Sequence, residues 1–207
     1  MKSVLISIQP RWCELIASGE KTLEVRKTKP KLETPFKCYI YCTLPPKTEL
    51  FTHGCIREYL NELIRLQSGE IVYGYGMQLC CDPKNRPYTE DNFLCQKIIG
   101  EFICDAILSH CEMANADIAE AQSCVSLEKI LEYSGGYEVY GWHISDLKIY
   151  NKPMKLDQFR KPIDCHRGKQ REDCVGCWEC EIKRPPQSWC YVEASRSSET
   201  STTTRRF

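Results

Sequence analysis

Several signatures of common protein classes are missing from this sequence. No apolar run approaches the roughly 20 residues that a membrane-spanning helix needs, and the apolar start Val4–Ile8 ends at Gln9-Pro10, too early for a secretory signal. A GxxxxGK[ST] loop, a GxGxxG turn and a Ser/His/Asp order are also absent. NTPase and dehydrogenase functions therefore have no support, and we expect a cytoplasmic protein without a membrane partner.

Net charge is also lacking, because 28 Lys and Arg balance 28 Asp and Glu. The charges are nevertheless unevenly spread. Residues 21–37 hold six Lys/Arg against two Glu, residues 97–147 hold two Lys against nine Asp/Glu, and residues 148–184 are basic again. Basic segments of this kind either are solvated surface or meet phosphates.

Cysteine, by contrast, is abundant, with 15 residues in a chain of 207. The odd count and the missing signal argue for a reducing compartment, where most cysteines act as small core hydrophobes. This interpretation covers Cys38, Cys42, Cys80, Cys81, Cys95, Cys104, Cys111, Cys124 and Cys190.

The hydrophobic pattern predicts strands that outnumber short helices. Strands are expected at 4–9, 21–27, 37–43, 70–81, 97–109, 141–150 and 188–193. Helices are expected from Pro10 to Gly19, around 56–64, and after an N-capping Ser126 up to Gly135-Gly136. Regular β-α alternation is missing, so we predict the α+β class, with a mixed β-barrel flanked by short α-helices.

Particular motifs resemble the ASCH family of PUA-like domains. They are Ser7-Ile8-Gln9-Pro10, the stretch Gly19-Glu20-Lys21-Thr22-Leu23-Glu24-Val25-Arg26, Gly100-Glu101-Phe102, and Gly141-Trp142-His143-Ile144-Ser145-Asp146-Leu147. The segments 140–150 and 184–192 resemble a subgroup found in gut bacteria and their phages. The resemblance covers residues 1–150 as the ASCH/PUA-like domain, with a last strand at 188–193. The remainder is a basic, Cys-rich insertion at 151–187 and a disordered tail at 195–207.

The resemblance implies a PUA-like barrel with a basic cleft that binds RNA or a nucleotide-like ligand. Some members hydrolyse N4-acetylcytidine with a lysine, a threonine and a glutamate. The lysine falls on Lys21, and the glutamate corresponds to Glu128. The threonine position holds Glu24 instead, with Thr22 nearby, which is a departure from the family pattern.

The residues themselves allow a functional and a purely structural interpretation. Lys21 at the mouth of a strand could hold a phosphate or act as a base, and Glu24 could carry protons or simply pair with a surface cation. Ligand contact is predicted for Arg11, Trp12, Lys21, Thr22, Arg26, Lys27 and His143. For Trp12 the alternative is a core anchor of the first helix, and for His143 it is a half-exposed strand residue. Trp142 is expected to lie inside the core.

A second cluster of candidate ligands lies in the Cys-rich segment. Cys174, Cys177 and Cys180 are each three residues apart, and Cys165 or His166 could complete a tetrahedral structural zinc site. An iron–sulfur cluster is a weaker alternative, and a loop of free thiols is the third.

Three functions thus stay open on the sequence. The first is an RNA-binding module built on a basic cleft. The second is a hydrolase of a modified nucleoside, or a ribonuclease, that uses Lys21 with Glu24 or Glu128. The third is a protein-interaction module that uses the Cys-rich segment.

Overall fold

The computed structural model describes residues 2–43, 95–114, 116–163, 177, 179–194 and 204–205. The helix predicted around 56–64 and the strand predicted at 70–81 lie outside these residues. The same holds for Cys80 and Cys81, and for most of the predicted tail, of which Thr204–Arg205 forms strand β10. No helix among the described residues has the length and apolarity to cross a membrane.

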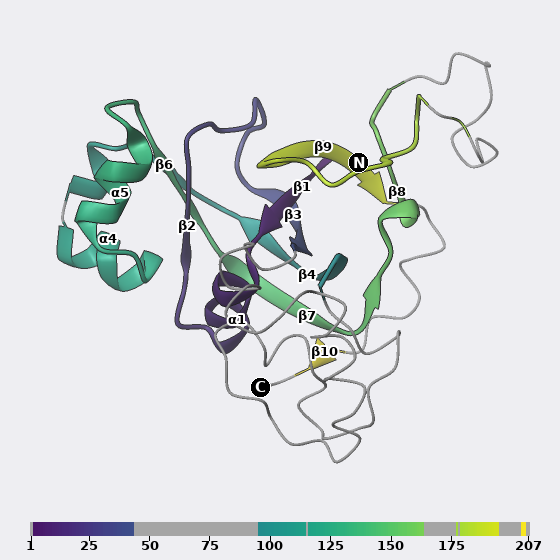
Figure 1. Ribbon diagram of the computed structural model, residues 1–207, viewed down its shortest axis with the longest axis horizontal. Coiled ribbons are helices and arrows are strands. Elements are labelled where there is room, and N and C mark those ends of the chain that lie inside the picture. Colours follow the sequence, from purple (N-terminus) through teal and green to yellow (C-terminus); the bar gives the residue numbers. More distant parts are fainter. Residues whose placement is uncertain are drawn as a thin grey trace, which may run out of the picture.

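Strands dominate the described part, as the α+β prediction requires (Figure 1). They are β1 (Ser3–Ile8), β2 (Leu23–Arg26), β3 (Phe36–Cys42), β4 (Lys97–Cys104), β5 (Ile107–Leu108), β6 (Tyr140–His143), β7 (Ser145–Met154), β8 (Phe159–Arg160), β9 (Trp189–Ala194) and β10 (Thr204–Arg205). The helices are α1 (Pro10–Ser18), α4 (Ala116–Ser123) and α5 (Leu127–Ser134), with 3₁₀ turns at Glu112–Ala114 and Leu156–Gln158.

Within the described residues the strands form two sheets. The larger has the order β10-β7-β4-β3-β1-β9-β8, and the smaller has the order β2-β6-β5. β1 and β3 run parallel, with Val4 opposite Cys38, whereas the other pairings in both sheets are antiparallel. The sheets are therefore mixed, and the predicted α+β class is confirmed.

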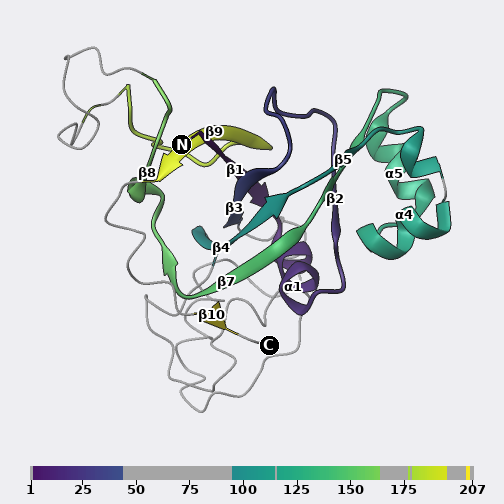
Figure 2. The ribbon, with the colours of Figure 1, turned by 180° about the vertical axis from the view of Figure 1, so that it is seen from behind.

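Two segments of the chain join the sheets, because each bends and passes from one sheet into the other. The predicted strand 97–109 breaks at Asp105-Ala106 into β4 and β5, and the predicted strand 141–150 breaks at Ile144 into β6 and β7. β4 pairs with β7 in the larger sheet, and β5 pairs with β6 in the smaller one. Asp146 just after the second break has φ of 45°, a value that short polar residues tolerate best. The bend gives the sheets the curvature of a half-closed barrel (Figure 2).

The main core fills the inside of this curved surface. It contains Ile6, Ile40, Phe102 and the fully buried Trp142, which was expected inside. Cys13, Cys38, Cys42, Cys95 and Cys104 also lie there, so these cysteines behave as core hydrophobes. Burial raises the pKa of the Cys104 thiol to about 12, which keeps it protonated and inert. Cys111 is exposed, which corrects the core assignment for that residue, and Cys124 and Cys190 are partly buried.

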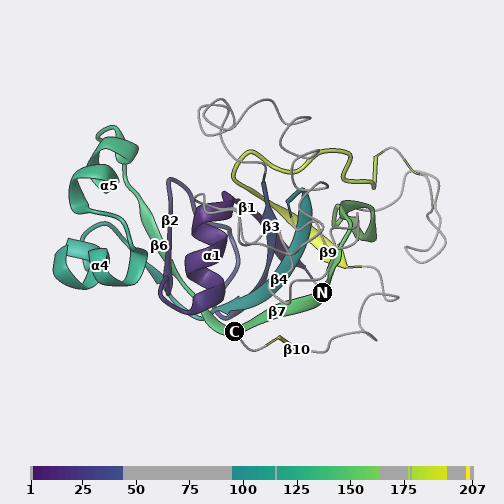
Figure 3. The ribbon, with the colours of Figure 1, turned by 60° about the horizontal axis from the view of Figure 1, so that its bottom comes forward.

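The helices flank the barrel at the positions that matter for the site. α1 begins at Pro10 and ends at Ser18, and Gly19 caps it with a φ of 83°, the left-handed conformation that glycine adopts without strain. α4 and α5 pack together beside the smaller sheet (Figure 3), and α4 was not predicted. Ser126 occupies the predicted N-cap of α5, but its side chain makes no capping bond, and the Glu120 carboxylate accepts the N–H of Leu127 instead.

Candidate functional site

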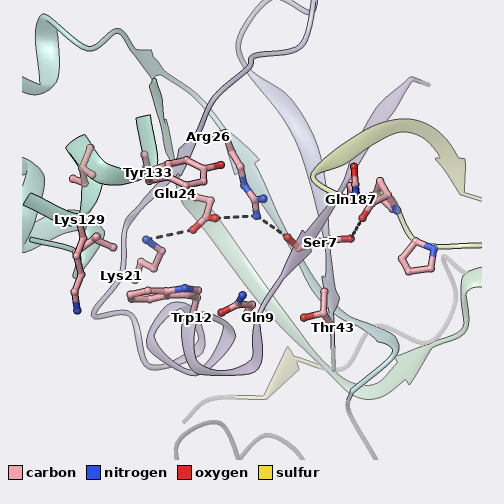
Figure 4. Close-up of a pocket in the computed structure, with 15 residues that line it drawn as sticks. Ser7, Gln9, Trp12, Lys21, Glu24, Arg26, Thr43, Lys129, Tyr133 and Gln187 are labelled. Carbon is pink, nitrogen blue, oxygen red and sulfur yellow. Dashed lines mark hydrogen bonds and ion pairs between the residues drawn. The ribbon is translucent and has the colours of Figure 1, made fainter. Parts of the chain in front are cut away.

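A cleft of about 620 Å³ opens beside α1. It runs from the cleft-facing side of α5, across β2, to the ends of β1 and β3 and the segment that leads into β9 (Figure 4). Its lining is Ser7, Gln9, Trp12, Lys21, Glu24, Val25, Arg26, Thr43, Val125, Lys129, Ile130, Tyr133, Pro185, Pro186 and Gln187. Three cations and one carboxylate stand in this list, so the cleft carries a net positive charge.

Charged side chains form the floor of the cleft. Lys21, Glu24 and Arg26 are only 2%, 6% and 9% exposed. The left-handed turn at Gly19 carries the chain back toward α1, and the N–H of Lys21 donates to the carbonyl of Leu15. In β2, Leu23 packs into the cluster beneath α4 and α5, while Glu24 and Arg26 face the cleft, as strand alternation predicts.

The Lys21 ammonium has three acceptors within reach. Its Nζ donates to the carbonyl of Leu23 at 2.9 Å and of Ser123 at 2.6 Å, and lies 3.3 Å from Oε2 of Glu24. Three acceptors match the three donors of a protonated amine, which has no lone pair. This geometry suits a fixed positive charge better than a general base.

Arg26 continues the chain of charges toward β1. Its Nη2 donates to Oε1 of Glu24 at 2.9 Å and to the carbonyl of Ser7 at 2.6 Å, and its Nη1 lies 3.4 Å from Oγ of Ser188. β2 and β1 belong to different sheets among the described strands, so these bonds join the two sheets across the cleft. The buried Arg26 Nε has no hydrogen-bond partner in the described part of the chain.

Aromatic rings form parts of both walls. The Trp12 ring has the Lys21 ammonium 5.1 Å from its centroid and the Arg11 guanidinium 4.3 Å from it, distances at which cations are attracted to the ring face. On the opposite wall, Tyr133 is 43% exposed and has Lys27 Nζ 4.9 Å from its centroid. A planar group entering the cleft thus finds Trp12 on one side and Tyr133 on the other (Figure 4).

The structure brings together part of the predicted site. Lys21, Glu24, Arg26 and Trp12 line the cleft. Arg11 and Lys27 do not line it but lie over its two aromatic rings. The backbone of Thr22 bonds to Gln122 and Ile144, and its side chain does not line the cleft.

Two further predicted residues lie apart from the cleft. Glu128 is exposed on α5, one position before Lys129, which does line the cleft. His143 on β6 is half-exposed, and its Nδ1 lies 2.6 Å from Oδ1 of Asp105. This contact lowers the pKa of Asp105 below its ordinary value.

Other lining residues were missed by sequence reasoning. Lys129, Ile130 and Tyr133 come from α5, where Tyr133 is four positions after Lys129 and three after Ile130, spacings that place each pair on one side of a helix. Gln9, Thr43 and residues 185–187 come together only through the pairing of β1 with β3 and β9, for which no local signal exists.

For the predicted zinc site the structure describes two of the four thiols. Cys177 and Cys180 are buried and pack against each other, and the N–H of Cys180 donates to the carbonyl of Cys177 at 3.1 Å. Cys165 and Cys174, together with His166, lie outside the described residues. The zinc site stays a prediction.

The fold and the cleft define a class: an α+β protein with a half-closed mixed barrel and a polar cleft at its seam. No protein-family model and no curated protein matches the chain. It is similar to the crystal structure of ASCH from Zymomonas mobilis, with 16% identity, coverage of 92% of this chain and 87% of that chain, and a TM-score of 0.48. A mutant of that protein gives 15% identity, coverage of 92% and 88%, and a TM-score of 0.49.

These structures bear the name of the family that the sequence resembles. The class of fold rests on the strand order described above, and the subgroup stays a prediction.

Proposed function

We propose that this protein binds RNA and holds a nucleotide unit in the cleft. The observation that supports it best is the floor of Lys21, Glu24 and Arg26, set between the rings of Trp12 and Tyr133. Phosphates are attracted to a net positive cleft, and bases stack on aromatic faces at about 1–3 kcal/mol each. The ASCH resemblance of the sequence implies the same ligand class.

Each end of a nucleotide has a matching feature in this proposal. Lys129 at the rim and Lys21 at the floor supply positive charge for a phosphate. Tyr133, which lines the cleft and is 43% exposed, supplies a surface for a base. Because Lys21 has its three protein acceptors already, its contribution to a phosphate is the field of a fixed charge rather than a new short bond.

The test is equilibrium binding of a fluorescent single-stranded RNA over a series of salt concentrations. Lys129→Ala should reduce the slope of log affinity against log salt by about one phosphate contact. Tyr133→Ala should weaken binding by about five- to a hundredfold through lost stacking. Lys148→Ala and Tyr137→Ala are matched controls, because both side chains are exposed and lie outside the cleft lining.

The comparison between the cleft variants and the control variants decides whether the proposal holds. Unchanged affinity in both cleft variants, or equal losses in the cleft and control variants, would contradict the proposal. Thermal unfolding of each variant shows whether the fold is intact.

A second candidate is hydrolysis of a modified nucleoside, and one observation favours it. The Lys21 ammonium and the Glu24 carboxylate lie 3.3 Å apart at the floor of the cleft, which places a proton carrier beside a fixed positive charge. In such a reaction water would add to the amide carbonyl of N4-acetylcytidine, the C–N bond would break, and cytidine and acetate would leave. Glu24 would take the proton from water and give it to the leaving nitrogen of cytidine, and Lys21 would stabilise the oxyanion.

Incubation with N4-acetylcytidine and with a short RNA, followed by mass spectrometry, tests this candidate. Turnover that is lost in Lys21→Ala while the variant stays folded would establish a hydrolase or a ribonuclease. If both substrates stay intact while RNA is retained in a salt-sensitive way, binding would remain as the function and hydrolysis of these substrates would be ruled out.

A further inference from the structure

The two ends of the cleft differ in chemistry. The end near α5 is charged and aromatic, with Lys129, Lys21 and Tyr133. The end near β1 and β3 is lined by the polar side chains of Ser7, Gln9, Thr43 and Gln187, and the Arg26 guanidinium reaches it at the carbonyl of Ser7. In Figure 4 the two glutamines lie on either side of Ser7, away from Lys129.

Gln9 sits on a fixed piece of backbone. It is the N-cap of α1, and its carbonyl accepts the N–H groups of Trp12 and Cys13 at 3.0 Å each. Its side chain makes no capping bond and is exposed to the cleft. The backbone of Gln9 is therefore fixed by α1, while its carboxamide makes no capping bond to the helix.

Gln187 is held in a similar way from the opposite wall. On one side, the carbonyl of Pro186 accepts the Ser7 hydroxyl at 2.6 Å. On the other, the carbonyl of Ser188 accepts the N–H of Ser7 at 2.9 Å, and Arg26 reaches Oγ of Ser188. The backbone on both sides of Gln187 is thus bonded to residues of the cleft, while its side chain is exposed and has no partner among the described residues.

We propose that Gln9 and Gln187 read the edge of an unpaired base, while the phosphate of the same strand lies at the Lys129 end. This inference rests on the proposed RNA-binding function and adds its specificity. A carboxamide offers a donor and an acceptor side by side, which matches the adjacent donor and acceptor on a base edge. Two such groups in the lining of one cleft would discriminate between bases, whereas the charges attract any strand.

The burial of the floor explains why the base must be unpaired. Lys21, Glu24 and Arg26 are each about nine-tenths or more buried, so only a group that enters the cleft reaches them. A paired base presents its hydrogen-bonding edge to its partner strand, and a duplex is read by shape and backbone. A single-stranded segment can insert one base and keep its phosphates at the rim.

The experiment measures the affinity of the full chain for three RNAs of about ten nucleotides, poly(A), poly(C) and poly(U), and for a duplex of the first and third. The variants are Gln9→Ala, Gln187→Ala, Lys129→Ala and, as a glutamine control on α4, Gln122→Ala. We expect the wild type to prefer one homopolymer over the others and over the duplex. Each cleft-glutamine variant should reduce that preference by about tenfold. Lys129→Ala should weaken all single strands by a similar factor and leave the ratios unchanged.

Other outcomes separate this inference from the function on which it rests. Base reading is overturned if the preference stays unchanged in the glutamine variants, or if the wild type binds all three homopolymers equally; either result leaves RNA binding standing. Duplex binding as tight as single-strand binding overturns the unpaired base. No binding of any RNA by the folded wild type overturns both proposals. Gln187→Glu adds a sharper probe, because a carboxylate only accepts and should move the preference toward bases that present an amino group.

Discussion

Two carboxylates in this molecule each hold two cationic side chains, but in different surroundings. Glu24 pairs with Lys21 and Arg26 at the floor of the cleft, where the three side chains are 8%, 2% and 11% exposed. Glu101 on β4 lies 3.2 Å from Lys37 and 3.8 Å from Lys148, and these lysine side chains are 38% and 52% exposed. The residue types are alike, so the exposure of the pairs to solvent determines how much they contribute to the stability of the fold.

Water screens the Glu101 pairs and offers each lysine an alternative partner, so such pairs contribute about 0–1 kcal/mol. The Glu24 pairs have no such alternative. A buried charge that loses its partner keeps its desolvation penalty, so removing one member costs about 3–5 kcal/mol. The Glu24 chain also joins α4 to β1, through Ser123 and Ser7, whereas the Glu101 pairs join neighbouring strands that already share backbone bonds.

The largest effect is expected for Glu24→Gln. The change leaves Lys21 and Arg26 close together without a negative charge between them. We expect the free energy of unfolding, measured in urea, to fall by about 3–5 kcal/mol. A loss under about 1 kcal/mol would show that the floor is far wetter than its burial indicates.

Arg26→Lys is expected to cause the second largest loss in the free energy of unfolding. It keeps the charge but removes the planar fork that reaches Glu24, Ser7 and Ser188 together. We expect a loss of about 2 kcal/mol in thermal or urea unfolding, since two of these hydrogen bonds involve a charged donor in a buried place. Full stability in this variant would mean that charge alone, and not the fork, joins the two sheets.

Glu101→Gln provides the matched case, in which the carboxylate is 12% exposed but its two lysine partners are 38% and 52% exposed. The amide retains an acceptor for the Tyr150 hydroxyl, which donates to Glu101 at 2.8 Å, and only the screened lysine pairs are lost. Burial and this hydrogen bond raise the pKa of Tyr150, so it stays a neutral donor at working pH. We expect a change of about 1 kcal/mol or less in the same urea experiment. A loss as large as that of Glu24→Gln would remove the contrast between the two carboxylates.

The smallest effect is expected at the exposed pair of His143 and Asp105. The contact lowers the pKa of Asp105, so its contribution to stability is present above the ordinary carboxyl pKa and is lost as pH falls through the lowered value. His143→Ala should change the unfolding free energy by well under 1 kcal/mol near neutral pH, given the exposure of both groups. Urea unfolding near pH 6 and near pH 3 checks this: wild type and variant should differ less at the lower pH.

The hydrophobic pattern of the sequence was sufficient to predict most of the local secondary structure. The strand at 4–9, the helix between Pro10 and Gly19, and the strand near 188–193 appear as β1, α1 and β9, because apolar periodicity and Pro/Gly boundaries are properties of short segments. The long predicted strands were each divided in two, at Ala106 and Ile144, because a bend between sheets depends on pairing partners elsewhere in the chain. α4 was missed, since its short sequence has little amphipathic pattern.

The candidate site, like the secondary structure, could be predicted only in part from the sequence. Lys21, Glu24 and Arg26 could be predicted to lie together, because they share one turn-and-strand segment after Gly19. Lys129 and Tyr133 could not, because they come from a helix more than a hundred residues away, and Glu128 was chosen in place of its neighbour. One step along a helix turns a side chain by about 100°, so only the packed position of α5 decides which residue faces the cleft.

The sequence by itself determined the α+β class, the order of the main elements and the composition of the charged segment after Gly19, because these follow from local periodicity and turn chemistry. Only the tertiary structure decided that this segment lies buried at a seam between two sheets, with Ser123 behind it and Ser7 ahead of it. Burial and long-range partners arise from packing between segments far apart in the chain, and they turn an ordinary Lys-Glu-Arg pattern into the floor of a cleft.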